Sequence, residues 1–377
     1  MSRRLALLFL VTLCHLALVA PASAASPLAA VQASAYIVQN AATGEVLAAR
    51  NADRPVAIAS ITKLLTVLVA LDHAKLSDVV TVDRRAAVVG ESSIDLRPGE
   101  KLTVHDLVEG ALIQSANDAA DALALHVAPS YPAFAELMNA KAAELGLHDS
   151  HFVRPDGLDA PGEWSTARDV TRLARIAMRN PFVRATVRKE RDTIAGGRVL
   201  YTWDDLLGEF PGLLGVKTGH TASAGWSQVA AVRGRGVTVY ATILGEPTRG
   251  QRNADLATLL AYGLAQYVVV DAVQRGRVYA TAELPYGRAP VPLVAQRGST
   301  LVVRAGRPLV ERVVAPAAVA LPVRAGQPLG EVQVSRNGRV IARRPLVAAR
   351  SVERPGVGGR VAWYAKRTAR HVAGWIT

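Results

Sequence analysis

Apolar and polar residues alternate along residues 33–51 on both sides of Ala42-Thr43-Gly44, and this pattern predicts a β-hairpin. Hydrophobic residues then recur at helical spacing, which predicts helices over residues 58–73, 105–127, 132–145 and 166–179.

Strand patterns return at 214–221 and 225–245, with a glycine-rich turn at 233–236, and a last helix is expected over 253–267. Strands at both ends of a helical block predict an α+β fold, in which helices pack on an antiparallel sheet.

Beyond residue 272 the pattern changes to short strands separated by glycine and proline. Asn337-Gly338 is a typical two-residue hairpin turn. The segment RAGRPLVE at 304–311 recurs as RAGQPLGE at 324–331, which indicates internal similarity. This part of the chain is expected to form a small all-β domain.

The N-terminus has the pattern of a secretory signal peptide. Two arginines precede an apolar run at 5–19, and Ala22-Ser23-Ala24 offers a cleavage site. The run is too short for a membrane-spanning helix. Cys14, the one cysteine, lies inside it, so the mature chain is expected to contain no disulfide.

These boundaries predict four segments. They are a signal peptide at 1–24, a first domain at 25–271, a small β domain at 272–354 and a C-terminal helix at 355–377.

Charge separates the two halves of the mature chain. Residues 272–377 hold 18 Lys plus Arg and 4 Asp plus Glu, a net charge of +14, whereas residues 25–271 hold 24 and 27, a net charge of −3. The basic half either uses arginine as its ordinary exposed residue or faces an anionic surface. Nucleic acid is not the expected partner, since the chain is exported and carries no nucleic-acid motif.

Candidate chemistry begins with Ser60 and Lys63, which lie one helical turn apart in an apolar segment. A serine hydroxyl becomes a good nucleophile when an adjacent base removes its proton. Burial disfavours the charged ammonium, and a helix N-terminus at Ser60 would do the same, so Lys63 can act as a neutral base.

Two more motifs follow in order: Ser115-Ala116-Asn117 between helical segments and Lys217-Thr218-Gly219 on a predicted strand. S-x-x-K, S-x-N and K-T-G in this order are the motif set of the penicillin-recognising serine enzymes. Ser335-Arg336-Asn337 also matches S-x-N, but it lies in a hairpin turn of the β domain and is a chance match.

With these motifs and their surroundings, the sequence resembles the low-molecular-mass penicillin-binding proteins that are serine-type D-alanyl-D-alanine carboxypeptidases with a second β domain. The similarity includes GESSIDLRPGEKLTVHDLVEGALIQSANDAADALA, HFVRPDGLDAPGEWSTARD and GVKTGHTASAGWSQVAA, and runs from about residue 30 to the C-terminus. It implies a β-lactamase/transpeptidase-like domain followed by the all-β domain.

The resemblance also implies roles. Ser60 attacks the carbonyl between two D-alanines of a peptidoglycan stem peptide, Lys63 is its base, Ser115 relays a proton to the leaving amine, and Asn117 holds the substrate amide. Lys217 and Thr218 bind the terminal carboxylate. Gly219 lets substrate lie along the strand, and the backbone N–H groups of Ser60 and His220 form the oxyanion hole. β-Lactam antibiotics act as acylating inhibitors, and no cofactor or metal is implied.

Some positions leave alternatives open. Arg252 matches a family arginine near the carboxylate site, but it could equally be a surface arginine at the start of a helix. Ala116 stands where these carboxypeptidases often have glycine, which affects deacylation or antibiotic preference rather than reaction class. His148 and His151 could suggest zinc, but no third ligand accompanies them.

The C-terminal helix is predicted to be amphipathic. One arc holds Val361, Tyr364, Ala365, Thr368, Val372, Trp375 and Ile376, and the opposite arc holds Arg360, Lys366, Arg367 and Arg370. This pattern favours an interfacial anchor that attaches the exported protein peripherally to the outer face of the cytoplasmic membrane, near the cell wall or in the periplasm. The alternative is a helix that docks on its own domain.

The function predicted is thus a penicillin-sensitive carboxypeptidase of peptidoglycan biosynthesis and cell shape. A D,D-endopeptidase on cross-linked peptidoglycan is the nearest alternative, because the same acyl transfer serves both reactions. A catalytically inactive wall-binding protein is less favoured, since the motif residues are intact. A β-lactamase is disfavoured by the absence of E-x-x-L-N and by the added β domain.

Overall fold

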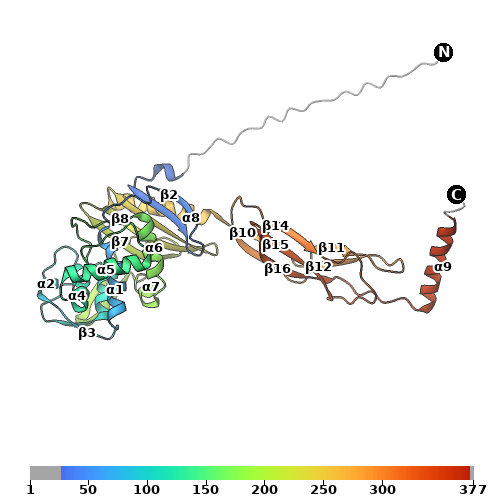
Figure 1. Ribbon diagram of the computed structural model, residues 1–377, viewed down its shortest axis with the longest axis horizontal. Coiled ribbons are helices and arrows are strands. Elements are labelled where there is room, and N and C mark those ends of the chain that lie inside the picture. The colour runs from blue at the N-terminus through green and yellow to red at the C-terminus, as the bar shows by residue number, and fades with distance from the viewer. Residues whose placement is uncertain (1–26, 374–377) are drawn as a thin grey trace, which may run out of the picture.

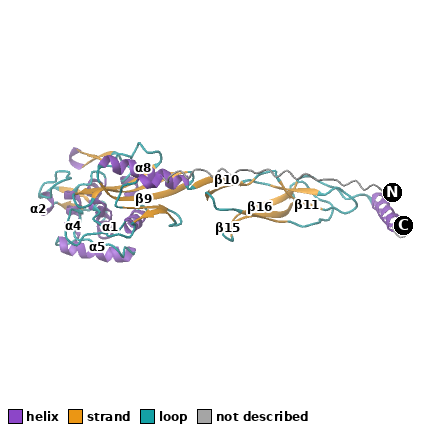
Figure 2. Ribbon diagram, turned by 90° about the horizontal axis from the view of Figure 1, so that it is seen from above, coloured by secondary structure: helices purple, strands orange, loops and turns teal. Residues whose placement is uncertain are grey.

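The computed structural model describes residues 27–373. The predicted signal peptide with Cys14 lies outside the described residues, as do Trp375 and Ile376, and nothing is described for the side chain of Val372. The molecule is elongated: a mixed helix and sheet region lies at one end, a narrow β region follows, and the last helix lies at the far end (Figures 1 and 2).

The first region is built on a five-stranded antiparallel sheet in the order β2-β1-β9-β8-β7. The strands are β1 (Ala35–Asn40), β2 (Val46–Arg50), β7 (Leu213–Thr221), β8 (Gly225–Gly234) and β9 (Val237–Glu246). The predicted hairpin forms β1 and β2. Arg235 and Gly236, both with positive φ, make the two-residue turn between β8 and β9. β7, which carries the K-T-G motif, is an edge strand.

Helices cover both faces of this sheet. One face packs on a helical block whose core includes Ile37 of β1 and Val229 of β8. The other face packs on α8 (Arg249–Ala265) through Leu256 and Leu260. The block contains α1 (Lys63–His73), α2 (Arg84–Ala87), α3 (Val104–Leu112), α4 (Asn117–Val127), α5 (Tyr131–Leu145), α6 (Ala167–Ala177) and α7 (Pro181–Thr186).

Three predicted helices differ in their bounds. The segment 58–73 begins as a 3-10 turn, η2 (Ala59–Thr62), before α1. The segment 105–127 is two helices, because Ser115 adopts a left-handed backbone with φ of 62° between α3 and α4. The last helix starts at Arg249 rather than 253, because the side chain of Thr248 caps it by accepting from the backbone of Gln251.

Shorter elements complete the region. They are η1 (Pro27–Ala30), η3 (Ala195–Gly197) and two small antiparallel hairpins, β3 (Val79–Thr81) with β4 (Lys101–Thr103) and β5 (Arg191–Ile194) with β6 (Arg198–Tyr201).

The β region has its own apolar core, formed by residues such as Val291, Leu293, Val332 and Leu346. Asn337 and Gly338, both with positive φ, form the predicted hairpin turn. A two-stranded sheet pairs β10 (Tyr267–Val273) with β13 (Ser299–Arg304). A five-stranded sheet has the order β11-β12-β16-β15-β14, with β11 (Val278–Ala282), β12 (Val291–Ala295), β14 (Val310–Val314), β15 (Pro328–Arg336) and β16 (Arg339–Ala348).

The last helix, α9 (Val357–Ala373), lies at the end of the β region remote from the first region (Figure 1). Its described side chains are exposed on nearly every face, and Trp363 makes its main contact, edge-on to the ring of Tyr286. Extensive docking on the protein is therefore not seen in the described part of α9. Between residues 27 and 373, no helix has the length and apolar character needed to cross a bilayer.

Candidate active site

Ser60 lies in the 3-10 turn η2, which is held between two other segments of the chain. A Cβ at Gly219 of β7 would lie 2.7 Å from the carbonyl oxygen of Ile58, and one at Gly157 would lie 2.2 Å from that of Ala59. Both positions therefore require glycine so that β7 and the loop at 155–163 can approach the turn. For Gly219 this close packing is a reason that the sequence did not reveal.

Lys63 begins α1 directly behind Ser60 and is fully buried. Its Nζ donates to three oxygens: Ser60 Oγ at 2.7 Å, Asn117 Oδ1 at 2.6 Å and the backbone carbonyl of Asp156 at 2.6 Å. Burial lowers the pKa of Lys63 to about 8, although the nearby carboxylates of Asp156 and Asp121 favour its charged form. The S-x-x-K and S-x-N motifs thus meet at one amine.

A second buried lysine stands beside Ser115. Lys217 Nζ donates to Ser115 Oγ at 2.8 Å and to the backbone carbonyl of Thr218 at 2.9 Å. Burial lowers the pKa of Lys217 well below its usual value, and the positive charge of Lys63 acts in the same direction. The left-handed backbone of Ser115 is a strained conformation of the kind found at functional sites.

These groups border a cavity of about 380 Å³. The lining residues are Ser60, Glu91, Ser92, Ser115, Asn117, Trp203, Thr218, Gly219, His220, Trp226 and Arg252. Of the residues predicted for the site, Lys63 and Lys217 lie just behind this lining, and the other seven form part of it. Lys217 therefore faces Ser115 rather than the open cavity.

Arg252 is not the surface arginine that the sequence left open. Its side chain is 1% exposed, in the first turn of α8, and it lines the same cavity as Ser115. Its guanidinium bonds to Asp205 at 3.2 Å and to Asn253 at 2.6 Å, and lies over the ring of Trp226. A buried guanidinium at a cavity wall is suited to binding a carboxylate.

Sequence reasoning missed several residues of the site. Trp203 and Trp226 line the cavity, and Asp205 orients Arg252. The carboxyl of Asp121 is fully buried one turn after Asn117, and burial raises its pKa to about 7. A tryptophan followed by two aspartates, WDD at 203–205, was the available signal, but no motif marks it.

His151 stacks on Trp164, and its Nδ1 lies 2.6 Å from the carbonyl oxygen of Gly162. Within residues 27–373 no cluster of three or more His, Cys, Asp or Glu side chains could hold a metal ion.

A serine hydrogen-bonded to a buried lysine, a second buried lysine and a buried arginine meet around one cavity on an α+β scaffold, as expected of a penicillin-binding serine hydrolase. The profile of the family described as D-alanyl-D-alanine carboxypeptidase, Peptidase S11, matches residues 21–248. The profile of the penicillin-binding protein 5 C-terminal domain matches residues 267–354. The chain therefore belongs to the D-alanyl-D-alanine carboxypeptidase family of serine peptidases.

Individual relatives agree with this assignment. The D-alanyl-D-alanine carboxypeptidase DacC of Escherichia coli K12 is 32% identical over 351 residues, which are 88% of this chain and 87% of the relative. Penicillin-binding protein 5 of Haemophilus influenzae superposes with a TM-score of 0.62 at 26% identity, covering 86% of this chain and 98% of that one.

A mutant of the Streptomyces K15 DD-transpeptidase has a TM-score of 0.58 at 31% identity. It covers 62% of this chain and 98% of its own. The other 38% of this chain has no counterpart in that solved structure.

Proposed function

We propose that this chain is a D-alanyl-D-alanine carboxypeptidase that removes the terminal D-Ala from peptidoglycan stem peptides through an acyl-enzyme on Ser60. The observation that carries the proposal is the Lys63 amine, fully buried and 2.7 Å from Ser60 Oγ. With a pKa of about 8, roughly a tenth of Lys63 is neutral at pH 7 and able to take a proton.

In the first step, Lys63 Nζ takes the Ser60 proton while Ser60 Oγ bonds to the carbonyl carbon of the penultimate D-Ala. The backbone N–H groups of Ser60 and His220 stabilise the oxyanion, and such a donor typically contributes about 3 kcal/mol. β7 is an edge strand, so substrate can lie along it as an added strand, with Asn117 binding its amide.

The second step expels D-alanine. Ser115 Oγ gives its proton to the leaving nitrogen as the C–N bond breaks, and Lys217 at 2.8 Å supplies the next proton to Ser115. Thr218 and Arg252 hold the carboxylate of the departing residue. Lys217 lies close enough to add its charge to this end of the cavity when protonated. Water then hydrolyses the ester of Ser60: its hydroxyl bonds to the acyl carbon, Lys63 returns its proton to Ser60 Oγ, and the remaining water proton replaces the one that Lys217 gave up. A β-lactam acylates the same oxygen of Ser60.

The test uses the mature protein from Ala25 and a pentapeptide that ends in D-Ala-D-Ala, with free D-alanine as the readout. We expect release by the wild type and a loss of about a thousandfold or more in Ser60→Ala and Lys63→Ala. Ser223→Ala, an exposed serine outside the lining, is the matched control. A folded wild type that penicillin acylates but that releases no D-alanine would contradict the carboxypeptidase assignment.

For location, we propose an exported enzyme held peripherally at the outer face of the cytoplasmic membrane by α9. Val361 and Tyr364 are exposed on one side of α9, and Lys366, Arg367 and Arg370 are exposed as well. Exposed apolar side chains beside cations suit the interface of an anionic bilayer. The domains proposed for this arrangement are residues 25–271, 272–354 and 355–377. The boundary between the first two domains falls inside β10.

Sedimentation with vesicles of anionic and of zwitterionic phospholipid tests the attachment. The chain from Ala25 should bind anionic vesicles, less so at high salt, and the same chain ending at 354 should not. Equal binding of both chains would mean that α9 is not the anchor.

A further inference from the structure

The cavity has a defined end for the leaving residue, if the proposed function holds. Ser115 Oγ must reach the nitrogen of that residue, and Thr218 with Arg252 must reach its carboxylate. All three line the cavity. The Cα atom of the leaving residue, which joins that nitrogen to that carboxylate, therefore lies between the Ser115 loop and the first turn of α8.

Trp203 joins these two sides. Its indole N–H donates to the carbonyl oxygen of Gln114, the residue before Ser115, at 3.0 Å. The guanidinium of Arg249, in the first turn of α8, lies over its ring at 5.1 Å from the centroid. The indole is thus held by a hydrogen bond on one side and by a cation on the other.

The cation itself is fixed by the group that orients Arg252. Arg249 forms a two-pronged ion pair with Asp205, and the same carboxylate accepts from Arg252 and, at 2.8 Å, from Asn253. A shift of Trp203, which is 43% exposed, would remove its contact with the guanidinium of Arg249, and Asp205 fixes that guanidinium.

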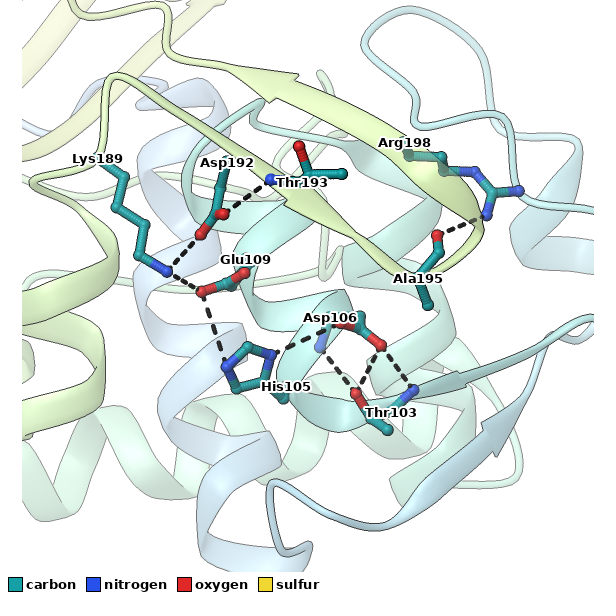
Figure 3. Close-up of polar contacts among 9 residues, drawn as sticks. All are labelled: Thr103, His105, Asp106, Glu109, Lys189, Asp192, Thr193, Ala195 and Arg198. Carbon is teal, nitrogen blue, oxygen red and sulfur yellow. Dashed lines mark hydrogen bonds and ion pairs between the residues drawn. The ribbon is translucent and has the colours of Figure 1, made fainter.

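The hairpin that precedes Trp203 is also anchored. Lys189, just before β5, pairs with Asp192 and with Glu109, a buried carboxylate on α3 that His105 approaches from the other side (Figure 3). Arg198 of β6 pairs with Glu100 at 2.7 Å. The β5–β6 hairpin is therefore tied to the helical block, and Trp203 is part of a fixed wall rather than of a mobile flap.

We infer that Trp203 closes the cleft around the side chain of the leaving residue and restricts that side chain to a methyl group. The chain then discriminates against a terminal D-residue with a long side chain. This inference rests on the proposed function and names its substrate class.

The experiment measures kcat/KM for one acyl donor that ends in D-Ala, D-aminobutyrate, D-norvaline or D-norleucine. For the wild type we expect kcat/KM to fall at least about tenfold from D-Ala to D-norleucine, because a pocket of methyl size excludes the longer side chain. Trp203→Ala should recover about tenfold on D-norleucine relative to D-Ala, and Trp203→Phe should recover less. Tyr201→Ala is the matched control, since Tyr201 is an exposed aromatic on the same hairpin outside the lining.

The outcomes are distinguishable. No D-Ala release by the folded wild type is a failure of the proposed function. If the wild type releases D-Ala but has the same kcat/KM for all four leaving residues, the inference is overturned. This outcome is measured on the wild type, so it holds even if Trp203→Ala does not fold. A Trp203→Ala enzyme that penicillin labels normally but that keeps the wild-type preference overturns it as well.

Discussion

The two main regions of this molecule treat charge in opposite ways. The first region buries ionisable side chains, among them Lys63, Glu109, Asp121, Lys217 and Arg252. In the described part of the β region, the buried polar side chain is the uncharged Ser299, and the core is otherwise apolar. Its many arginines lie at or near the surface, although the two cores are built by the same burial of apolar residues.

The difference shows where each region uses its charges. Burying a charge is costly unless partners compensate it, so a region that does so repeatedly has a use for perturbed ionisation. Burial lowers the pKa values of both Lys63 and Lys217. Exposed arginines keep their charge at any physiological pH and act on whatever surface lies nearby.

The pH dependence of the two regions should differ most. Because Lys63 must be neutral to take the Ser60 proton, and its pKa is about 8, acylation by penicillin should rise with pH and fall about fiftyfold from pH 8 to pH 6. Binding of anionic vesicles through arginines should stay constant over the same range. Penicillin labelling quenched at fixed times measures the acylation rate, and sedimentation measures vesicle binding. An acylation rate that does not change with pH would contradict the role of Lys63 as base.

Stability should separate the regions next. Glu109→Gln removes a buried carboxylate that pairs with Lys189, and because Lys189 is partly exposed we expect a loss of about 1–2 kcal/mol in the free energy of unfolding. Glu311→Gln removes an exposed pair with Arg277, 4.0 Å apart, and should cost less than about 0.5 kcal/mol. Urea unfolding compares them, and equal losses would remove this distinction between the regions.

A single exposed arginine of α9 should affect attachment without affecting chemistry. Arg370→Gln should weaken binding to anionic vesicles about fivefold, since one basic residue near the surface contributes about 1 kcal/mol. Arg188→Gln, an exposed arginine of the first region, is the control and should leave vesicle binding unchanged. Equal weakening by both variants would point to general charge attraction instead of α9.

The smallest effect is expected from removing the β region altogether. A chain of residues 25–266 should be acylated by penicillin within about twofold of the full rate, because the residues that line the cavity all precede β10. The Streptomyces transpeptidase, a solved structure that covers 62% of this chain, is similar in extent. A truncated chain that folds but is acylated much more slowly would show that the regions are coupled.

Local signals made much of this structure predictable. The turns at Arg235-Gly236 and Asn337-Gly338 follow from their glycines and from Asn337, which tolerate positive φ, and the three motifs follow from their order along the chain. The nine predicted site residues lie around one cavity because motif spacing reflects a fold that the sequence already resembles.

What depends on long-range packing was not predictable. Trp203 reaches the cavity because the hairpin before it is tied to α3 through Lys189 and Glu109. Arg252 is buried in α8, which begins four residues earlier than its pattern suggested. Nor did the motif reveal that Lys217 faces Ser115, since that contact joins residues far apart in the chain. Contacts of this kind have no signature within a short window of sequence.

The narrow space around the Ser60 turn has a consequence for how the protein matures. Gly157 and Gly219, both distant from Ser60 along the chain, must be seated before the turn takes its shape. An unfolded chain therefore has an ordinary serine and an ordinary lysine at positions 60 and 63. Covalent labelling with a fluorescent penicillin consequently counts only molecules whose first region has folded completely, which makes the antibiotic a gauge of folding.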